Sequence, residues 1–69
     1  MNRAAAGFHD ANGEFVTADT RVEHRFEGRQ GTVNAIFQDG EAEVIFDDGD
    51  LDLVEWDHIC KLSSWGEEI

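Results

Sequence analysis

The residues best suited to chemistry lie between positions 47 and 60 of this 69-residue chain. Asp48-Gly49-Asp50-Leu51-Asp52 places carboxylates at alternate positions, as calcium-binding loops do. The twelfth position of such a loop needs a bidentate glutamate, and Ile59 stands there. The pattern therefore allows at most weak divalent binding, and it favours a solvated acidic hairpin.

His58 and Cys60 form the second group with chemical potential. With His24 or His9 they offer metal-ligating side chains, but they lack the paired-cysteine spacing of structural zinc sites. A histidine beside a thiol also has the composition of a nucleophile and its base, yet so short a chain hardly encloses an ordinary substrate pocket. A buried thiol acting as a small apolar group is the simpler interpretation of Cys60. We predict a protein that is not an enzyme and has no metal site and no cofactor.

Length and cysteine content place further bounds on the class of protein. A chain of 69 residues allows one domain, and its core must be small. One cysteine cannot form an internal disulfide, which favours a reducing compartment. No apolar run approaches a membrane span, and the first residues lack the apolar stretch of a signal peptide. We expect a soluble, cytoplasmic protein without membrane contact.

The charge balance is the most unusual property of the sequence. Sixteen acidic residues face five basic ones, for a formal charge of −11, and no Lys or Arg occurs between Arg29 and Lys61. Direct nucleic-acid binding is disfavoured because it depends on cations, whereas a protein with a basic surface is a favoured partner. Adaptation for solubility or high salt is the alternative explanation. The nine acids of the interval are Asp39, Glu41, Glu43, Asp47, Asp48, Asp50, Asp52, Glu55 and Asp57.

Alternation of apolar and polar residues predicts the secondary structure from Thr20 onward. Runs of β-forming residues arrive every 8–12 positions, separated by glycine turns at Asp39-Gly40 and Asp48-Gly49, which predicts an antiparallel meander that curls into a barrel. A 3₁₀ turn and a closing strand are expected near the end. We divide the chain into an N-terminal arm (1–18), a barrel (19–62) and a C-terminal tail (63–69), with Trp65 as a residue able to dock.

The same alternation gives a predicted core. We expect one face of the first strand to hold Val22, His24 and Phe26. In the arm, a small hairpin around Asn12-Gly13 would pack Phe15 on the barrel. Gly31 stands where a loop bends into a strand, a place that often needs close backbone approach. The predicted core residues are Val22, Val33, Ala35, Val44, Phe46, Val54 and Ile59.

Short motifs add a family resemblance. Gly28-Arg29-Gln30-Gly31-Thr32-Val33, preceded by Val22, resembles the start of a KOW-type SH3-like barrel. Val44-Ile45-Phe46-Asp47-Asp48-Gly49, followed by Val54, Trp56 and Ile59, is similar to Tudor-like domains, where a Phe-Asp-Asp-Gly turn joins two central strands. The resemblance covers residues 20–62. It implies an all-β, SH3-like barrel of about five antiparallel strands, preceded by an irregular N-terminal arm.

The two relatives imply different ligands. KOW domains imply RNA or ribosome contact through basic loops, but the corresponding segments of this chain are acidic. Tudor-like domains imply recognition of methylated Lys or Arg in an aromatic cage. Rings for such a cage would have to come from Phe26, Phe37, Phe46 and Trp56 near Asp48. Aromatic residues in so small a barrel also serve as core.

We therefore predict a non-catalytic protein-binding module that docks a basic partner through an acidic barrel face, with exposed Trp56 or Phe37 as anchors. Two alternatives stay open: a nucleic-acid mimic, such as a phage or mobile-element inhibitor of a DNA- or RNA-binding enzyme, and a KOW-like transcription or ribosome-associated factor. An exposed sheet edge also allows a homodimer. The predicted partner-binding residues are Glu41, Glu43, Asp47, Asp48, Asp50, Asp52, Trp56 and Phe37.

Overall fold

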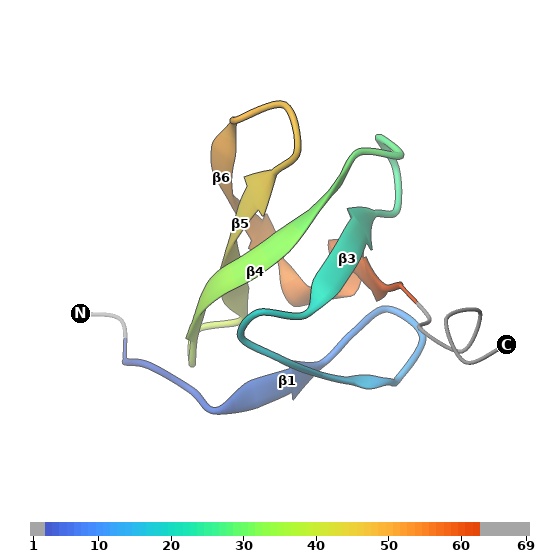
Figure 1. Ribbon diagram of the computed structural model, residues 1–69. Helices are drawn as coiled ribbons and strands as arrows, with labels where there is room; N and C mark the ends of the chain where they lie inside the picture. Colours follow the sequence, from blue (N-terminus) through green and yellow to red (C-terminus); the bar gives the residue numbers. More distant parts are fainter. Residues whose placement is uncertain (1–2, 63–69) are drawn as a thin grey trace, which may run out of the picture.

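Short strands joined by tight turns make up the chain in a computed structural model, which describes residues 3–62 (Figure 1). The predicted all-β class and the 3₁₀ turn before the last strand are both confirmed. Residues 3–62 contain no helix that could span a bilayer. The predicted tail and Trp65 lie outside the described part. The elements are β1 (Gly7–His9), β2 (Phe15–Thr17), β3 (Arg21–His24), β4 (Gln30–Phe37), β5 (Glu41–Phe46), β6 (Leu51–Glu55), η1 (Trp56–His58) and β7 (Ile59–Lys61).

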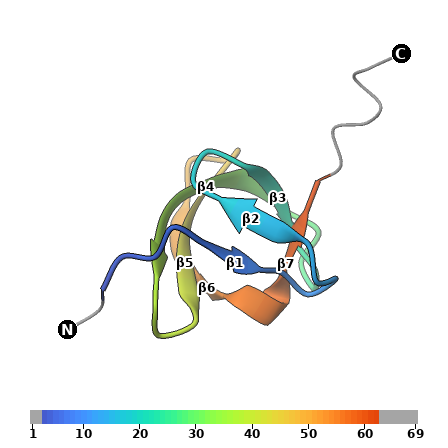
Figure 2. The same cartoon turned by 90° about the horizontal axis from the view of Figure 1, so that it is seen from below.

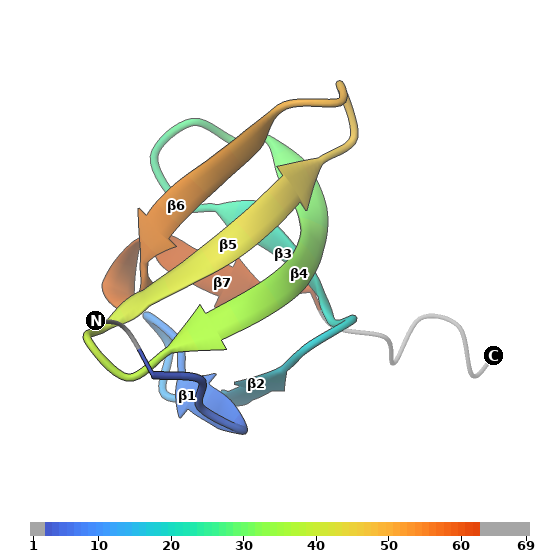
Figure 3. The same cartoon turned by 90° about the vertical axis from the view of Figure 1, so that its left-hand side faces the viewer.

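Five of these strands form one antiparallel sheet in the order β6-β5-β4-β3-β7. The sheet curves strongly, and the long strand β4 bends around the core (Figure 3). Among the described residues β6 pairs only with β5, and β7 pairs only with β3. The predicted five antiparallel strands are thus confirmed, but the hydrogen-bonded ladder does not close into a complete barrel.

Two glycines meet opposite demands of this sheet. Gly49 has φ +92° in the turn between β5 and β6, a conformation that L-residues rarely adopt, although a Cβ there would find open space. Gly31 lies on β4 with the backbone of β5 pressed against it, so that a Cβ would come within 2.6 Å of the Ile45 carbonyl oxygen. Close backbone approach at Gly31, as predicted, is therefore what excludes a side chain there.

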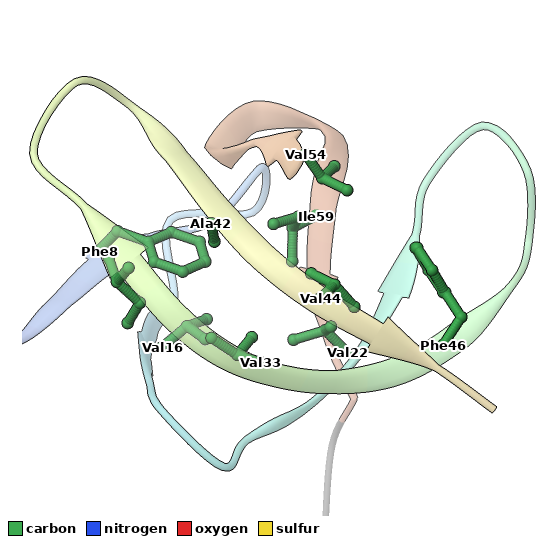
Figure 4. Packing of buried hydrophobic residues seen from close by; sticks show 10 residues of the cluster. Phe8, Val16, Val22, Val33, Ala42, Val44, Phe46, Val54 and Ile59 are labelled. Atoms are coloured by element: carbon green, nitrogen blue, oxygen red, sulfur yellow. The ribbon is translucent and has the colours of Figure 1, made fainter. Parts of the chain in front are cut away.

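The core fills the concave side of the curved sheet (Figure 4). Six of the seven predicted core residues are buried, but Ala35 is wrong: it is half-buried, and Ile36 takes its place. The cause is a β-bulge at Asn34, because β4 has one extra residue between the pairs Val33–Val44 and Ala35–Glu43. The extra residue shifts the alternation of side chains by one position. The buried hydrophobic residues are Phe8, Val16, Val22, Val33, Ile36, Ala42, Val44, Phe46, Val54 and Ile59.

The first strands form a regular hairpin that lies across one end of the curved sheet (Figure 2). Its register pairs Phe8 with Val16, and both side chains enter the core. The hairpin around Asn12-Gly13 is confirmed, but the packing of Phe15 is wrong, because alternation turns Phe15 outward and leaves it 51% exposed. Phe26, which we expected on the same strand face as Val22, is 67% exposed because β3 ends at His24 and a turn follows.

A buried carboxylate fastens this hairpin to the sheet. Asp10 is 7% exposed, and its Oδ1 accepts hydrogen bonds from the backbone N–H of Asn12 (2.9 Å) and Glu14 (2.8 Å). Its Oδ2 accepts a third from the N–H of Lys61 in β7, at 2.7 Å. Asp10 therefore satisfies the β1–β2 turn and joins it to the last strand, 51 positions away.

Replacing Asp10 with alanine should destabilise the whole fold. Asp10→Ala leaves three backbone N–H groups without their acceptor, so we expect a loss of about 2–3 kcal/mol in the free energy of unfolding, measured by urea denaturation. Glu14→Ala removes the same charge from an exposed side chain and should change stability by less than about 0.5 kcal/mol. Equal stability of the two variants would contradict a structural role for the Asp10 hydrogen bonds.

Candidate functional site

Two acidic segments that are far apart in the sequence meet at one end of the sheet. Because β5 and β6 run antiparallel, with Glu41 paired to Glu55, the turn before β5 and the 3₁₀ turn after β6 lie side by side. Between them is an open pocket of about 480 Å³. We call it the acidic pocket, and its lining residues are His9, Asp39, Gly40, Glu41, Glu55, Trp56 and Asp57.

The carboxylates of the acidic pocket have no strong cationic partner. Across residues 3–62, none of the four forms an ion pair with an arginine or lysine. Asp39 Oδ1 accepts only a backbone hydrogen bond, from the Glu41 N–H at 3.2 Å. Glu55 and Asp57 lie 3.7 and 3.8 Å from His58 Nε2, which is a cation only when protonated. Arg25 Nη1 donates a 3.0 Å hydrogen bond to the backbone carbonyl of Asp57, but the pocket lining itself holds four acids and no arginine or lysine.

Trp56 gives this pocket an aromatic wall. Its ring stacks on Phe8 of the N-terminal hairpin, with centroids 5.3 Å apart and planes within 10°. Trp56 is half-buried rather than exposed, which corrects our expectation of a free anchor. Its indole Nε1–H is buried and has no hydrogen-bond acceptor within residues 3–62. The stack fixes the ring, so the pocket exists before any ligand arrives.

At the opposite end of the β5–β6 hairpin, the acids are paired with arginines. Asp47, Asp48 and Asp50, which we call the turn acids, meet the two arginines Arg21 and Arg29. Arg21 binds Asp47 through two parallel hydrogen bonds of 2.7 Å. These bonds, and the attraction of the guanidinium, lower the pKa of Asp47 and raise that of Arg21.

Arg29 gathers the other turn acids. It lies 3.4 Å from Asp48 and 3.2 Å from Asp50, and it also binds Glu27 at 2.8 Å. Hydrogen bonding, first to Glu27, raises the pKa of Arg29. Its guanidinium sits 4.0 Å from the centre of the Phe46 ring. The aromatic ring nearest the turn acids thus already carries a cation of the protein's own.

The four rings considered for an aromatic cage do not share one site. Phe26 lies against His58, with centroids 5.0 Å apart, and Trp56 stacks on Phe8. Phe46 is buried beneath Arg29. In the part of the chain that the structure describes, no two of the four rings are in aromatic contact.

The remaining predicted residues occupy separate places. Glu43 accepts a 2.6 Å hydrogen bond from Asn34 Nδ2 at the bulge. Asp52 is exposed at the sheet edge, where its Oδ1 accepts the Leu53 N–H at 2.9 Å. Phe37 is half-buried on the outer face, opposite Glu41, and not the exposed anchor that we expected. Of the predicted set, only Glu41 and Trp56 line the acidic pocket.

Other chemical groupings are weaker. Glu55, Asp57 and His58 bring one ligand atom each within 4.8 Å of one another, a grouping that exposed acids commonly form without a metal. His24 Nδ1 accepts the N–H groups of Phe26 and Glu27, both at 3.2 Å, so this nitrogen orders the loop after β3. Cys60 is a half-buried free thiol.

No family model matches this chain, and no curated protein or solved structure matches it either.

Sequence reasoning overlooked Asp39, Glu55 and Asp57 as site residues. All three belong to the cation-free interval, but Asp39 lies in the turn before β5, Glu55 ends β6 and Asp57 lies in η1, away from the turn of Asp48 and Asp50. A usable signal was present: in an antiparallel hairpin, the residues before one strand and after the next return to the same end. His9, from the N-terminal hairpin, carried no such signal.

The Arg21–Asp47 ion pair should make the stability of the fold depend on pH in the acidic range. Because the folded-state pKa of Asp47 is lowered, its contribution is present above the unfolded pKa of about 3.9 and disappears as the pH falls through the folded value. We expect Arg21→Gln to lower the melting temperature at about pH 6 and to have little effect near pH 2. Arg3→Gln, an exposed control with the same charge change, should show no such pH-dependent difference. Matching profiles for the two variants would contradict the pair.

Proposed function

We propose that this protein is a non-catalytic binding module with an SH3-like fold, and that its acidic pocket receives a Lys or Arg side chain from a basic protein partner. The observation that carries the proposal is the set of four carboxylates around Trp56 that have no arginine or lysine partner among residues 3–62. The turn acids, which we predicted from the sequence as partner-binding residues, are already paired with arginines.

The topology supports the SH3-like part of the proposal. The sheet order β6-β5-β4-β3-β7 brings the last strand back beside the first strand of the sheet, with η1 immediately before it. This arrangement resembles the SH3-like barrel of KOW and Tudor-like domains. The N-terminal hairpin is an addition that covers one end and supplies Phe8 beneath Trp56.

The pairing of Glu41 with Glu55 supports the pocket as a binding site. Like charges directly opposite each other on neighbouring strands destabilise a sheet by roughly 0.2–1 kcal/mol. A cation between them would convert this repulsion into attraction. Sites that sacrifice stability in the free protein are typical of binding surfaces.

The chemistry of the pocket matches an alkylammonium or guanidinium group. Carboxylates form charge-assisted hydrogen bonds with either group, and an indole wall contacts the apolar stem of the same side chain. The overall charge of −11 would speed the encounter with a basic partner. Phosphate-bearing ligands would be repelled from this pocket for the same reason.

An oligolysine peptide tests the pocket directly. Trp65→Phe leaves Trp56 as the one tryptophan, whose fluorescence then reports binding. The double variant Glu41→Gln/Glu55→Gln should bind roughly tenfold or more weakly, because two of four pocket carboxylates are lost. It should also be more stable by roughly 0.2–1 kcal/mol, because the like-charge pair is gone.

Asp48→Asn/Asp50→Asn is the matched control. It removes the same charge from acids that Arg29 already pairs, so affinity should change less than about twofold. Equal weakening by both double variants would mean that overall charge, and not the pocket, attracts the peptide. Tight binding of the wild type to an RNA or DNA oligonucleotide would overturn the module altogether.

A further inference from the structure

We propose that the free edge of β6 accepts an extended segment of the basic partner as an additional β-strand, in which apolar and basic residues alternate. This inference rests on the proposed function and specifies how the partner would lie. The edge runs from the turn acids to the acidic pocket, because β6 ends at Glu55 and Trp56 follows.

The hydrogen-bonding register shows which groups of β6 are free. The Phe46 N–H binds the Asp50 carbonyl (2.7 Å), and the Trp56 N–H binds the Gly40 carbonyl (2.9 Å), so the even-numbered residues of this strand face β5. In an antiparallel ladder the intervening residues point their N–H and C=O groups the other way. Leu51, Leu53 and Glu55 therefore present these groups to the edge that no described strand covers (Figure 3).

The exposed side chains of Leu51, Asp52 and Leu53 alternate between apolar and acidic along this edge. Leu51 and Leu53 are 53% and 50% exposed on the outer face, beside Ile45, which is 41% exposed. Asp52 is on the other face of the strand, exposed, and has no arginine or lysine partner among residues 3–62. The row of Leu51 and Leu53 ends in Glu55, and on the other face Asp52 is followed by the buried Val54. An added strand with apolar residues beside Leu51 and Leu53 and a lysine or arginine beside Asp52 would match the exposed side chains of both rows.

Charge selects a basic segment over a second copy of this chain. Pairing two β6 edges would bring Asp52 and Glu55 close to the acids of the other copy, and each copy carries a charge of −11. Like charges across neighbouring strands are destabilising. The homodimer considered from the sequence is therefore the less favourable use of the same edge.

Asp52 also protects the free edge of β6 from unwanted strand pairing in the absence of a partner. Its carboxylate accepts the outward-pointing Leu53 N–H at 2.9 Å. A charged side chain that occupies an edge donor is a common protection against unwanted strand pairing. A lysine from the partner would attract this carboxylate and release the Leu53 N–H for the new ladder.

The test uses an acetylated peptide of alternating lysine and valine, titrated into the wild-type protein by calorimetry. Two matched peptides are methylated on the backbone nitrogens, one at every lysine and the other at every valine. Each keeps the charge and the side chains of the parent peptide but lacks the backbone N–H donors along one edge of its strand. We expect at least one methylated peptide to bind roughly tenfold more weakly. Hydrogen exchange at the amides of Leu51 and Glu55 should slow when the unmethylated peptide binds.

Variants of Leu53 give an independent arm. Leu53→Pro removes the outward N–H at a position that does not bond to β5, whereas Leu53→Ala keeps that N–H and removes most of the side chain. Greater weakening by proline than by alanine supports strand addition. If both methylated peptides bind as well as the parent and exchange at β6 is unchanged, strand addition is wrong. Weakening by Glu41→Gln/Glu55→Gln in that case would leave the proposed function intact.

Discussion

The positions of two arginines decide where the negative charge of this protein stays available. Arg21 and Arg29 both reach the turn between β5 and β6, where they bind Asp47, Asp48 and Asp50. At the other end of the β5–β6 hairpin, within residues 3–62, Arg25 reaches only the backbone carbonyl of Asp57, and no arginine or lysine forms an ion pair with a pocket carboxylate. The negative charge is therefore distributed unevenly along β5 and β6. The acids at one end are paired with arginines, whereas Asp52 on the edge and the acids of the pocket beside Trp56 are not.

The N-terminal hairpin makes that pocket a fixed structure. Asp10 fastens the hairpin to β7, and Phe8 enters the core beneath Trp56. In a domain with so few buried side chains, each of these contacts is a large part of the total stability. The segment that most resembled an arm in the sequence therefore supports both the core and the aromatic wall of the pocket, with His9 added to the lining.

Sequence alternation was enough to find the five-stranded sheet, its turns, the close approach at Gly31 and most of the core. It failed where the period breaks. The bulge at Asn34 exchanged Ala35 for Ile36, and the end of β3 at His24 released Phe26 to solvent. Ion pairs were beyond reach for another reason: Asp47 is 26 positions from Arg21, and a charge run in sequence does not show which cations fold back onto it.

Acids without an arginine or lysine partner at the pocket end, and not the total charge, make this molecule attractive to cations. Paramagnetic relaxation of backbone amides by a positively charged nitroxide cosolute measures that attraction site by site. We predict stronger relaxation of the amides of Gly40, Glu55 and Asp57 than of Asp48 and Asp50, and a negatively charged nitroxide should reverse the order. Equal relaxation at both ends of the hairpin would contradict it.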